Sequence, residues 1–325
     1  MKRTLIVAGL SALAAGSALA QSSVTVYGRA NVTAEAIDRN GTKTKELVNN
    51  ASRIGLKGTE DLGGGLKAGF QLEHGFSIDT GTPTQSAFWA RRSEVNLGSN
   101  SFGMLRLGNY FSEAYFAIAD YVSMHNHDTG TSSDALYAYL ARNTNKIAYR
   151  APEFVKGLSL EVAAALGEGQ SRIRTYDFAA NYQLGALALG AGYQKAGDAN
   201  QFAIRALYEA GPFVFGAYVQ RDENGFAATD ATGNVVAATA LGNRTNFRLS
   251  GMYALGASEF HLNFGSAGEY SKRSDSDATQ ITAAYNYNLS KRTKVYAYYT
   301  QVSDSSAKVY GGDFSSFALG LRHNF

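Results

Sequence analysis

The sequence predicts an all-β protein, a 16-stranded antiparallel transmembrane β-barrel with short turns at its periplasmic end and long loops at its extracellular end. Three observations predict this fold. Alternation of apolar and polar residues recurs along the chain, as in FALGLRHNF at residues 317–325. Short and long connections between these segments alternate along the chain, which is typical of outer-membrane barrels. After residue 20, no segment has the roughly 18 consecutive apolar residues that a membrane helix needs.

The first 20 residues, MKRTLIVAGLSALAAGSALA, have the organisation of a secretory signal peptide. Lys2 and Arg3 form a short positive region, an apolar stretch follows, and Ala18 and Ala20 are the small residues expected before a cleavage site. We therefore expect cleavage before Gln21 and a barrel over residues 21–325. The alternative for this segment is a buried core helix.

Charge and composition exclude several kinds of partner and chemistry. The chain has 30 Lys and Arg against 27 Asp and Glu, so loss of Lys2 and Arg3 leaves 28 basic residues and a nearly neutral protein. This balance gives no reason to expect nucleic acid as a partner. The absence of cysteine excludes disulfides and Cys-ligated metals. With 20 Tyr and 18 Phe, the chain is too aromatic for disorder.

Strand-like alternation defines sixteen expected strands. In the first, Val24 and Val26 share one face while Tyr27 and Arg29 lie on the other. Most segments have about nine to eleven residues, the length that a tilted strand needs to cross a bilayer. The expected strands lie near residues 24–37, 51–60, 66–77, 86–97, 103–110, 143–151, 158–167, 173–184, 187–196, 200–210, 213–221, 244–254, 258–267, 278–289, 293–302 and 315–325.

The connections favour a barrel over a water-soluble sandwich, which would bury alternate residues equally well. Those after even-numbered strands are short: 61–65, 99–102, 152–157, 184–186, 255–258 and 289–292. Most of those after odd-numbered strands are longer and more polar: 38–50, 111–142, 222–243, 268–277 and 303–314. A closed barrel also explains the apolar end of the chain, because the last strand then pairs with the first and Phe325 lies at the bilayer interface.

Several stretches resemble the trimeric general porins of Gram-negative bacteria, of the β-proteobacterial type. These are SSVTVYGRANV (22–32), SRIGLKGTEDLGGGLKAGFQLEHGF (52–76), SFGMLRLGNY (101–110), SKRTKVYAYYTQV (290–302) and FALGLRHNF (317–325). The resemblance implies a homotrimer in the outer membrane, surrounded by membrane lipid and lipopolysaccharide, with a third loop folded into the lumen. It also implies a water-filled channel for small hydrophilic solutes, and makes Phe325 the signal for outer-membrane insertion.

Two loops depart from the resemblance. The second loop, around 78–86, is short for an element that reaches into a neighbouring subunit in related porins. The third loop, residues 111–142, has a sequence of its own. The pore diameter therefore does not carry over from the family.

If the apolar faces point outward, basic residues predominate on the inward faces. Such a wall in a narrow aqueous pore concentrates anions, so we expect a preference for anions. The basic residues expected to line the pore are Arg29, Arg53, Lys57, Arg92, Arg106, Lys146 and Arg150. The third loop carries the expected acidic side of the constriction: Glu113, Asp120, Asp128 and Asp134.

Two other functions are the alternatives to a channel: an outer-membrane enzyme of the lipase or protease type, and a surface adhesin or receptor. The chain has no G-x-S-x-G elbow, no H-E-x-x-H and no G-x-G-x-x-G, so we expect no enzymatic activity and no cofactor. His125, His127 and Asp128 could hold a metal, but their spacing in a loop is weak support, and no metal is expected. The first strand begins close to Gln21, which leaves no room for a plug domain.

Overall fold

The structure, a computed structural model, describes residues 23–123, 135–140, 142–167, 173–225 and 240–325. The expected signal peptide lies outside the described residues, as do Asp128 and Asp134 of the third loop. Within the described chain, no helix is long and apolar enough to cross a membrane.

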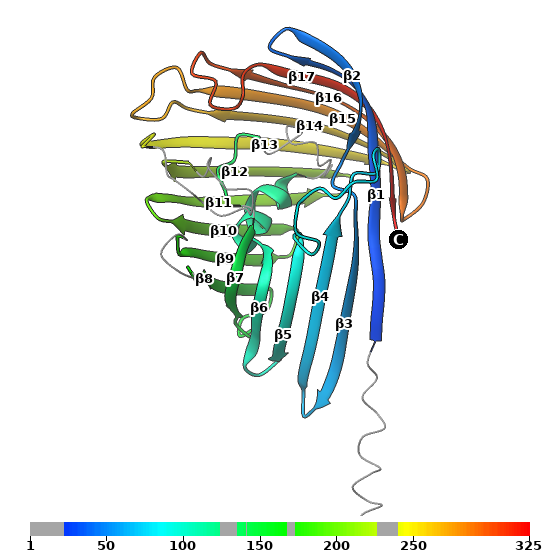
Figure 1. Ribbon diagram of the computed structural model, residues 1–325, viewed down its shortest axis with the longest axis vertical. Coiled ribbons are helices and arrows are strands. Elements are labelled where there is room, and N and C mark those ends of the chain that lie inside the picture. The colour runs from blue at the N-terminus through cyan, green and yellow to red at the C-terminus, as the bar shows by residue number, and fades with distance from the viewer. Residues whose placement is uncertain (1–22, 124–134, 141, 168–172, 226–239) are drawn as a thin grey trace, which may run out of the picture.

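The described strands form one antiparallel sheet that closes on itself (Figure 1). The last strand pairs with the first, with Arg29 opposite Asn324 and Arg39 opposite Phe314. The strands are β1 (Ser23–Arg39), β2 (Thr42–Asn49), β3 (Arg53–Gly63), β4 (Leu66–Gly75), β5 (Arg92–Ser99), β6 (Gly103–Phe111), β7 (Arg142–Arg150), β8 (Leu158–Ala165), β9 (Thr175–Leu184), β10 (Leu187–Ala196), β11 (Ala199–Ala210), β12 (Phe213–Glu223), β13 (Asn243–Leu255), β14 (Ser258–Ala267), β15 (Ala278–Asn288), β16 (Thr293–Asp304) and β17 (Phe314–Asn324).

These seventeen described segments make sixteen barrel strands, because β2 and β3 both pair with β1 and together form the second strand. Residues 50–52 interrupt it, and Ala51 there has a left-handed φ of 55°. The Ser52 hydroxyl oxygen accepts the backbone N–H of Asn31 at 2.9 Å, so β1 keeps a hydrogen-bond partner across the interruption. The prediction of a closed 16-stranded barrel is confirmed.

Two expected boundaries are wrong. The first connection is not a long loop over 38–50 but a tight hairpin, in which Asn40 and Gly41 both have positive φ. Asn-Gly favours such two-residue turns because their twist matches that of the flanking strands. The second loop is longer than expected: β5 begins at Arg92, and residues 76–91 form an irregular segment held by a bridge between Phe76 and Pro83.

The two faces of the barrel are inverted relative to a water-soluble protein. On β11, Phe202, Ile204 and Tyr208 are each about half exposed, whereas Ala203 and Arg205 between them are at most 4% exposed. The same alternation puts large apolar side chains outside on the other strands. Only a lipid environment makes an apolar exterior favourable, which excludes the sandwich alternative.

The third loop turns into the barrel. Its first part forms α2 (Glu113–Tyr115) and the π-helical segment η1 (Phe116–Asp120), which contact β9 and β10. Figure 1 shows these short helices inside the ring of strands. Ile118 and Val122 are fully buried and pack with Ala179, Ala203 and Tyr218 of the wall. The expected inward fold of the third loop is confirmed.

Candidate functional site

The third loop begins with a helical segment, residues 113–122, that we call the loop helix. Its first turn has free backbone N–H groups, which need acceptors. The Ser112 hydroxyl oxygen accepts the N–H of Tyr115 at 3.1 Å. From the wall, the Asp177 carboxylate on β9 accepts the N–H of Ala114 at 3.1 Å. A carboxylate at this end also complements the helix dipole, so both side chains favour a helix start at this point.

Donors from the wall bind the carbonyl groups farther along the loop helix. Arg205 on β11 donates from Nε to the Ala117 oxygen at 2.6 Å. Ser250 on β13 donates its hydroxyl proton to the Val122 oxygen at 3.1 Å. The barrel wall therefore offers an acceptor where the helix starts and donors where it ends. This polarity fixes the direction in which the loop crosses the lumen.

Two glycines of β10 make room for this approach. A Cβ atom at Gly190 would lie 2.7 Å from the Ala117 oxygen, and one at Gly192 would lie 3.0 Å from the Ala114 oxygen. Side chains at these inward positions would push the loop helix away from the wall. The helix can lie directly on β10 because both positions are glycine.

The returning part of the loop, residues 135–140, is held by two glutamines. Gln220 on β12 donates to the Ala138 oxygen at 2.7 Å and accepts the Ala138 N–H at 2.8 Å. Gln194 on β10 makes the same two bonds with Leu140, each 3.0 Å long. Each amide acts like a backbone group of a neighbouring strand. The sequence analysis did not identify these two glutamines. Strand alternation predicts that they face inward, but it does not predict which loop residues they bind.

Arg106 lies at the centre of an acidic cluster where the loop begins. Its guanidinium, 4% exposed, binds Glu94 through Nε at 2.8 Å and Nη2 at 3.0 Å. Its Nη1 binds Glu113 of the loop at 2.7 Å and Glu161 of β8 at 2.8 Å. Arg150 adds a second cation, 2.8 Å from Glu161 and 3.6 Å from Glu113. This cluster ties the loop helix to β5, β6, β7 and β8.

The Glu113 carboxyl group has a perturbed pKa. Burial alone raises this pKa, but the charge of Arg106 and its hydrogen bond outweigh burial and hold the pKa below its ordinary value. Glu113 thus stays ionised into the acid range. Its carboxylate anchors the loop through its ion pairs with Arg106 and Arg150.

Lys146, expected to line the pore, is buried at 1% exposure beneath the loop. Its ammonium group donates to the Phe111 oxygen at 3.3 Å, lies 3.8 Å from the Asp177 carboxylate and stands over the Tyr110 ring at 4.5 Å. Lys146 and Arg106 therefore do not present open charges to solutes. Arg150, with a side chain 41% exposed, is the most accessible cation of this group.

A second group of basic residues lies on the wall formed by β16, β17, β1 and β3. Arg29 of β1 is directly opposite Arg53 of β3, and Lys294 of β16 is opposite Arg322 of β17. Lys57, two residues after Gly55 on β3, is exposed and stands over the Tyr27 ring at 5.4 Å. We call Arg29, Arg53, Lys57, Lys294 and Arg322 the basic wall.

Acidic groups moderate this wall at its edges. Glu73 on β4 lies 3.9 Å from Arg53 and 2.7 Å from Arg91, and it accepts the Tyr27 hydroxyl at 2.9 Å. Arg92, expected to line the pore, binds Gln71 at 2.8 Å and lies 3.4 Å from Glu94. Arg91 was missed because the expected strand 86–97 gave it outward parity. Arg91 precedes β5, so the alternation of faces along a strand does not apply to it.

The remaining expected site residues have varied outcomes. Asp120 ends η1 and is half-buried. Asp128 and Asp134, like His125 and His127, lie outside the described residues. In the part of the chain that the structure describes, no group of three His, Cys, Asp or Glu side chains is arranged to hold a metal.

An apolar exterior, a charged interior and a loop that narrows the interior define a membrane channel of the β-barrel class. A family profile described as "Gram-negative porin" matches residues 5–307. The chain belongs to this family, whose members lie in the outer membrane.

Known proteins agree with this assignment. Outer membrane porin protein 32 of Delftia acidovorans is 33% identical over the whole of both chains. Among solved structures, an anion-selective porin from Comamonas acidovorans has a TM-score of 0.77 at 26% identity, covering 94% of this chain and all of that one. The outer-membrane protein OmpT of Vibrio cholerae, described as a trimer form, has a TM-score of 0.71 at 15% identity, covering 94% and 99% of the two chains.

Proposed function

We propose that this porin is a passive channel for small hydrophilic solutes that prefers anions and carries out no covalent chemistry. The basic wall is the observation that carries this proposal. Like charges directly opposite on neighbouring strands destabilise a sheet, yet Arg29 faces Arg53 and Lys294 faces Arg322 in register. Glu73 and Glu259 offset part of this repulsion, at 3.9 Å from Arg53 and 3.4 Å from Lys294, and the cations still outnumber the carboxylates on this lumenal surface.

The electrostatic argument is simple. A surface of one sign in a narrow aqueous passage with low-dielectric walls raises the local concentration of the opposite ion. Arginine keeps its charge at any physiological pH and binds carboxylates and phosphates well. The Comamonas relative is described as anion-selective, which supports the same preference in this chain.

The test is ion selectivity in a planar bilayer under a KCl gradient. We expect a reversal potential on the chloride side, and a shift toward the potassium side when Arg29 and Arg53 are both changed to Gln. Arg221→Gln is the matched control, because Arg221 lies at an outward, exposed position of β12 and binds Asn243 and Thr245. A wild-type reversal potential on the potassium side would contradict the proposed preference. Absence of conductance would favour an enzyme or receptor.

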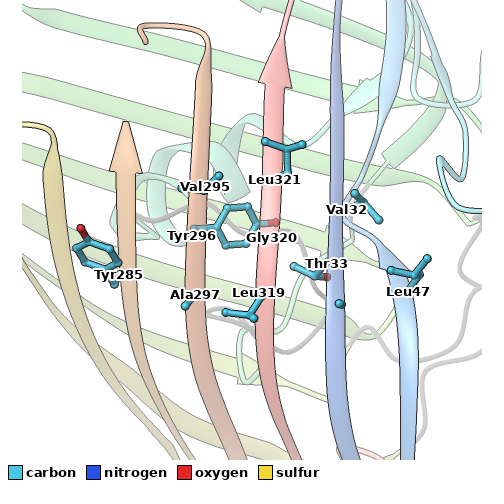
Figure 2. A pocket seen from close by; sticks show the side chains of 11 residues that line it. Val32, Thr33, Leu47, Tyr285, Val295, Tyr296, Ala297, Leu319, Gly320 and Leu321 are labelled. Carbon is cyan, nitrogen blue, oxygen red and sulfur yellow. The ribbon is translucent and has the colours of Figure 1, made fainter. Parts of the chain in front are cut away.

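We also propose that the protein is a homotrimer. A shallow apolar hollow on the outer face supports this, and Figure 2 shows it across β15, β16, β17, β1 and β2. Ala34 and Ala297 line it together with Leu47, Leu319 and Leu321. Small residues between larger ones suit close packing against another protein surface. Outside this contact, membrane lipid and lipopolysaccharide would cover the barrel.

The oligomeric state can be tested at the hollow. Ala34→Phe fills it and should lower the fraction of trimer on gels run without heating. Ala206→Phe, at an outward and exposed position of β11, is the control and should leave the trimer intact. Equal trimer fractions in both variants would place the interface elsewhere.

Cleavage before Gln21 is part of the same proposal, because an exported barrel needs a leader. The intact mass of protein purified from outer membranes should correspond to residues 21–325. A mass that includes residues 1–20 would contradict it.

A further inference from the structure

Arg205 of β11 binds the loop helix and two neighbouring strands through one side chain. Its side chain is buried, with the residue 4% exposed. Besides its bond to the Ala117 oxygen, it donates from Nη1 to the Ala188 oxygen at 2.9 Å and from Nη2 to the Asn181 side chain at 2.6 Å. One guanidinium thus joins β9, β10, β11 and the loop.

The same guanidinium also lies over an exposed ring of the loop. Its Cζ atom is 3.5 Å from the centroid of Tyr121, which is 40% exposed. A cation over an aromatic face is attracted to it, so Arg205 positions the ring that follows η1. Because the loop lies inside the barrel, the exposed part of Tyr121 faces the lumen.

Arg205 differs from four other inward cations in the groups that balance its charge. Arg106, Arg150, Lys146 and Arg244 each form an ion pair, whereas Arg205 forms none among the described residues. Among the described residues, its charge is balanced by carbonyl and amide dipoles and by the Tyr121 ring. In low-dielectric surroundings an unpaired charge acts over a longer distance than a paired one.

Gly190 shows that this contact needs a specific space. A Cβ atom at this position would lie 2.7 Å from both the Ala117 oxygen and the Arg205 Nε. The loop oxygen and the guanidinium therefore meet above a glycine, and even a methyl group would separate them.

We propose that Arg205 both helps to position the third loop at the constriction and contributes to anion preference there. This inference rests on the proposed anion-preferring channel. The positioning role and the charge role can be measured separately. Positioning determines how steady the open channel is, and the unpaired charge contributes to the reversal potential.

The test compares Arg205→Lys and Arg205→Met in full-length protein reconstituted in planar bilayers. Lysine keeps the charge but cannot reproduce the three hydrogen bonds of the guanidinium and its contact with the Tyr121 ring. We expect Arg205→Lys to increase open-channel current noise while retaining the reversal potential. Arg205→Met should increase the noise and also shift the reversal potential toward potassium. Arg221→Met removes the same charge from an outward position and should change neither.

Each part can fail separately. If Arg205→Met shifts the reversal potential no more than Arg221→Met, the charge role is wrong. If neither Arg205 variant alters the noise, the positioning role is wrong. A wild-type channel that prefers cations would refute the proposed function, while the noise comparison would still decide the positioning role.

Two milder variants cover the case in which Arg205 variants do not fold. Gly190→Ala moves the loop oxygen but leaves every charge in place, and Tyr121→Ala removes the ring while leaving the wall intact. Both should increase the noise without the selectivity shift. Steady currents in both variants would overturn the proposal.

Discussion

Phe325 and Gly28 close the barrel as a reciprocal pair. The Gly28 N–H donates to the Phe325 oxygen at 2.9 Å, and the Phe325 N–H donates to the Gly28 oxygen at 3.1 Å. The Phe325 ring lies against the outward face of Gly28, in the space that a Cβ atom would occupy. The last residue of the chain is therefore held by the sixth residue of β1, and its ring is 42% exposed on the lipid-facing side.

Gly28→Ala should destabilise the barrel by about 1–3 kcal/mol, the usual cost of overpacking. The new methyl group would overlap the Phe325 ring and lie 2.6 Å from the Arg53 oxygen, which is backbone and cannot move freely. Gly251→Ala is the matched control, because the nearest atom to a Cβ there is 4.0 Å away. The free energy of unfolding can be measured by urea titration with heat-modifiable gel mobility. Equal losses in both variants would contradict the prediction.

Phe325→Ala tests the expected role of this residue in outer-membrane insertion. We expect a lower amount of folded protein in outer-membrane fractions, with unfolded protein accumulating before insertion. Phe317→Ala is the control, since Phe317 is an outward residue of the same strand and is 52% exposed. A similar reduction in both would show a general loss of apolar surface and no special role for the terminus.

Arg106→Gln should loosen the entrance of the third loop. The change leaves Glu94, Glu113 and Glu161 close together without their shared cation, and removing one partner of a buried ion pair costs about 3–5 kcal/mol. We expect a lower unfolding free energy and noisier channels. Arg150→Gln, which removes a half-exposed cation, should have a smaller effect. The order of the two effects is the measured quantity.

The anchor of Glu113 should depend on pH in one direction. Its pKa is lowered in the folded protein, so its stabilisation is complete above the ordinary carboxyl value of about 4.3. This stabilisation is lost as the pH falls through the lower, folded value. Open-channel noise should therefore stay constant from pH 7 to about pH 5 and rise below about pH 4.

Glu113→Gln tests whether this carboxyl group is responsible for the acid response. The variant should already be noisy at pH 7 and should change less on acidification than the wild type. An identical acid response in wild type and variant would show that Glu113 is not responsible.

Strand count and facing follow from local chemistry. Alternation along each segment places residues such as Arg29 and Phe202 on opposite faces with no knowledge of their neighbours, because the side-chain period of a strand is two. Asn40-Gly41 is a strong local signal for a two-residue turn, and the expectation of a long loop there was wrong. The length of the irregular segment before Arg92 was predicted wrongly, because irregular backbone has no regular alternation of apolar and polar residues.

The candidate site depended on long-range contacts. Sequence alone determined that the protein is an apolar-outside barrel whose inward positions carry many cations. Only the tertiary structure decided where these cations lie and what they contact: Arg106 and Lys146 are buried beneath the loop, while Arg29 and Arg53 lie on the basic wall. The physical reason is that pairing depends on strand register and on the path of the third loop. Both bring together residues such as Ala117 and Arg205, which are 88 positions apart and share no local pattern.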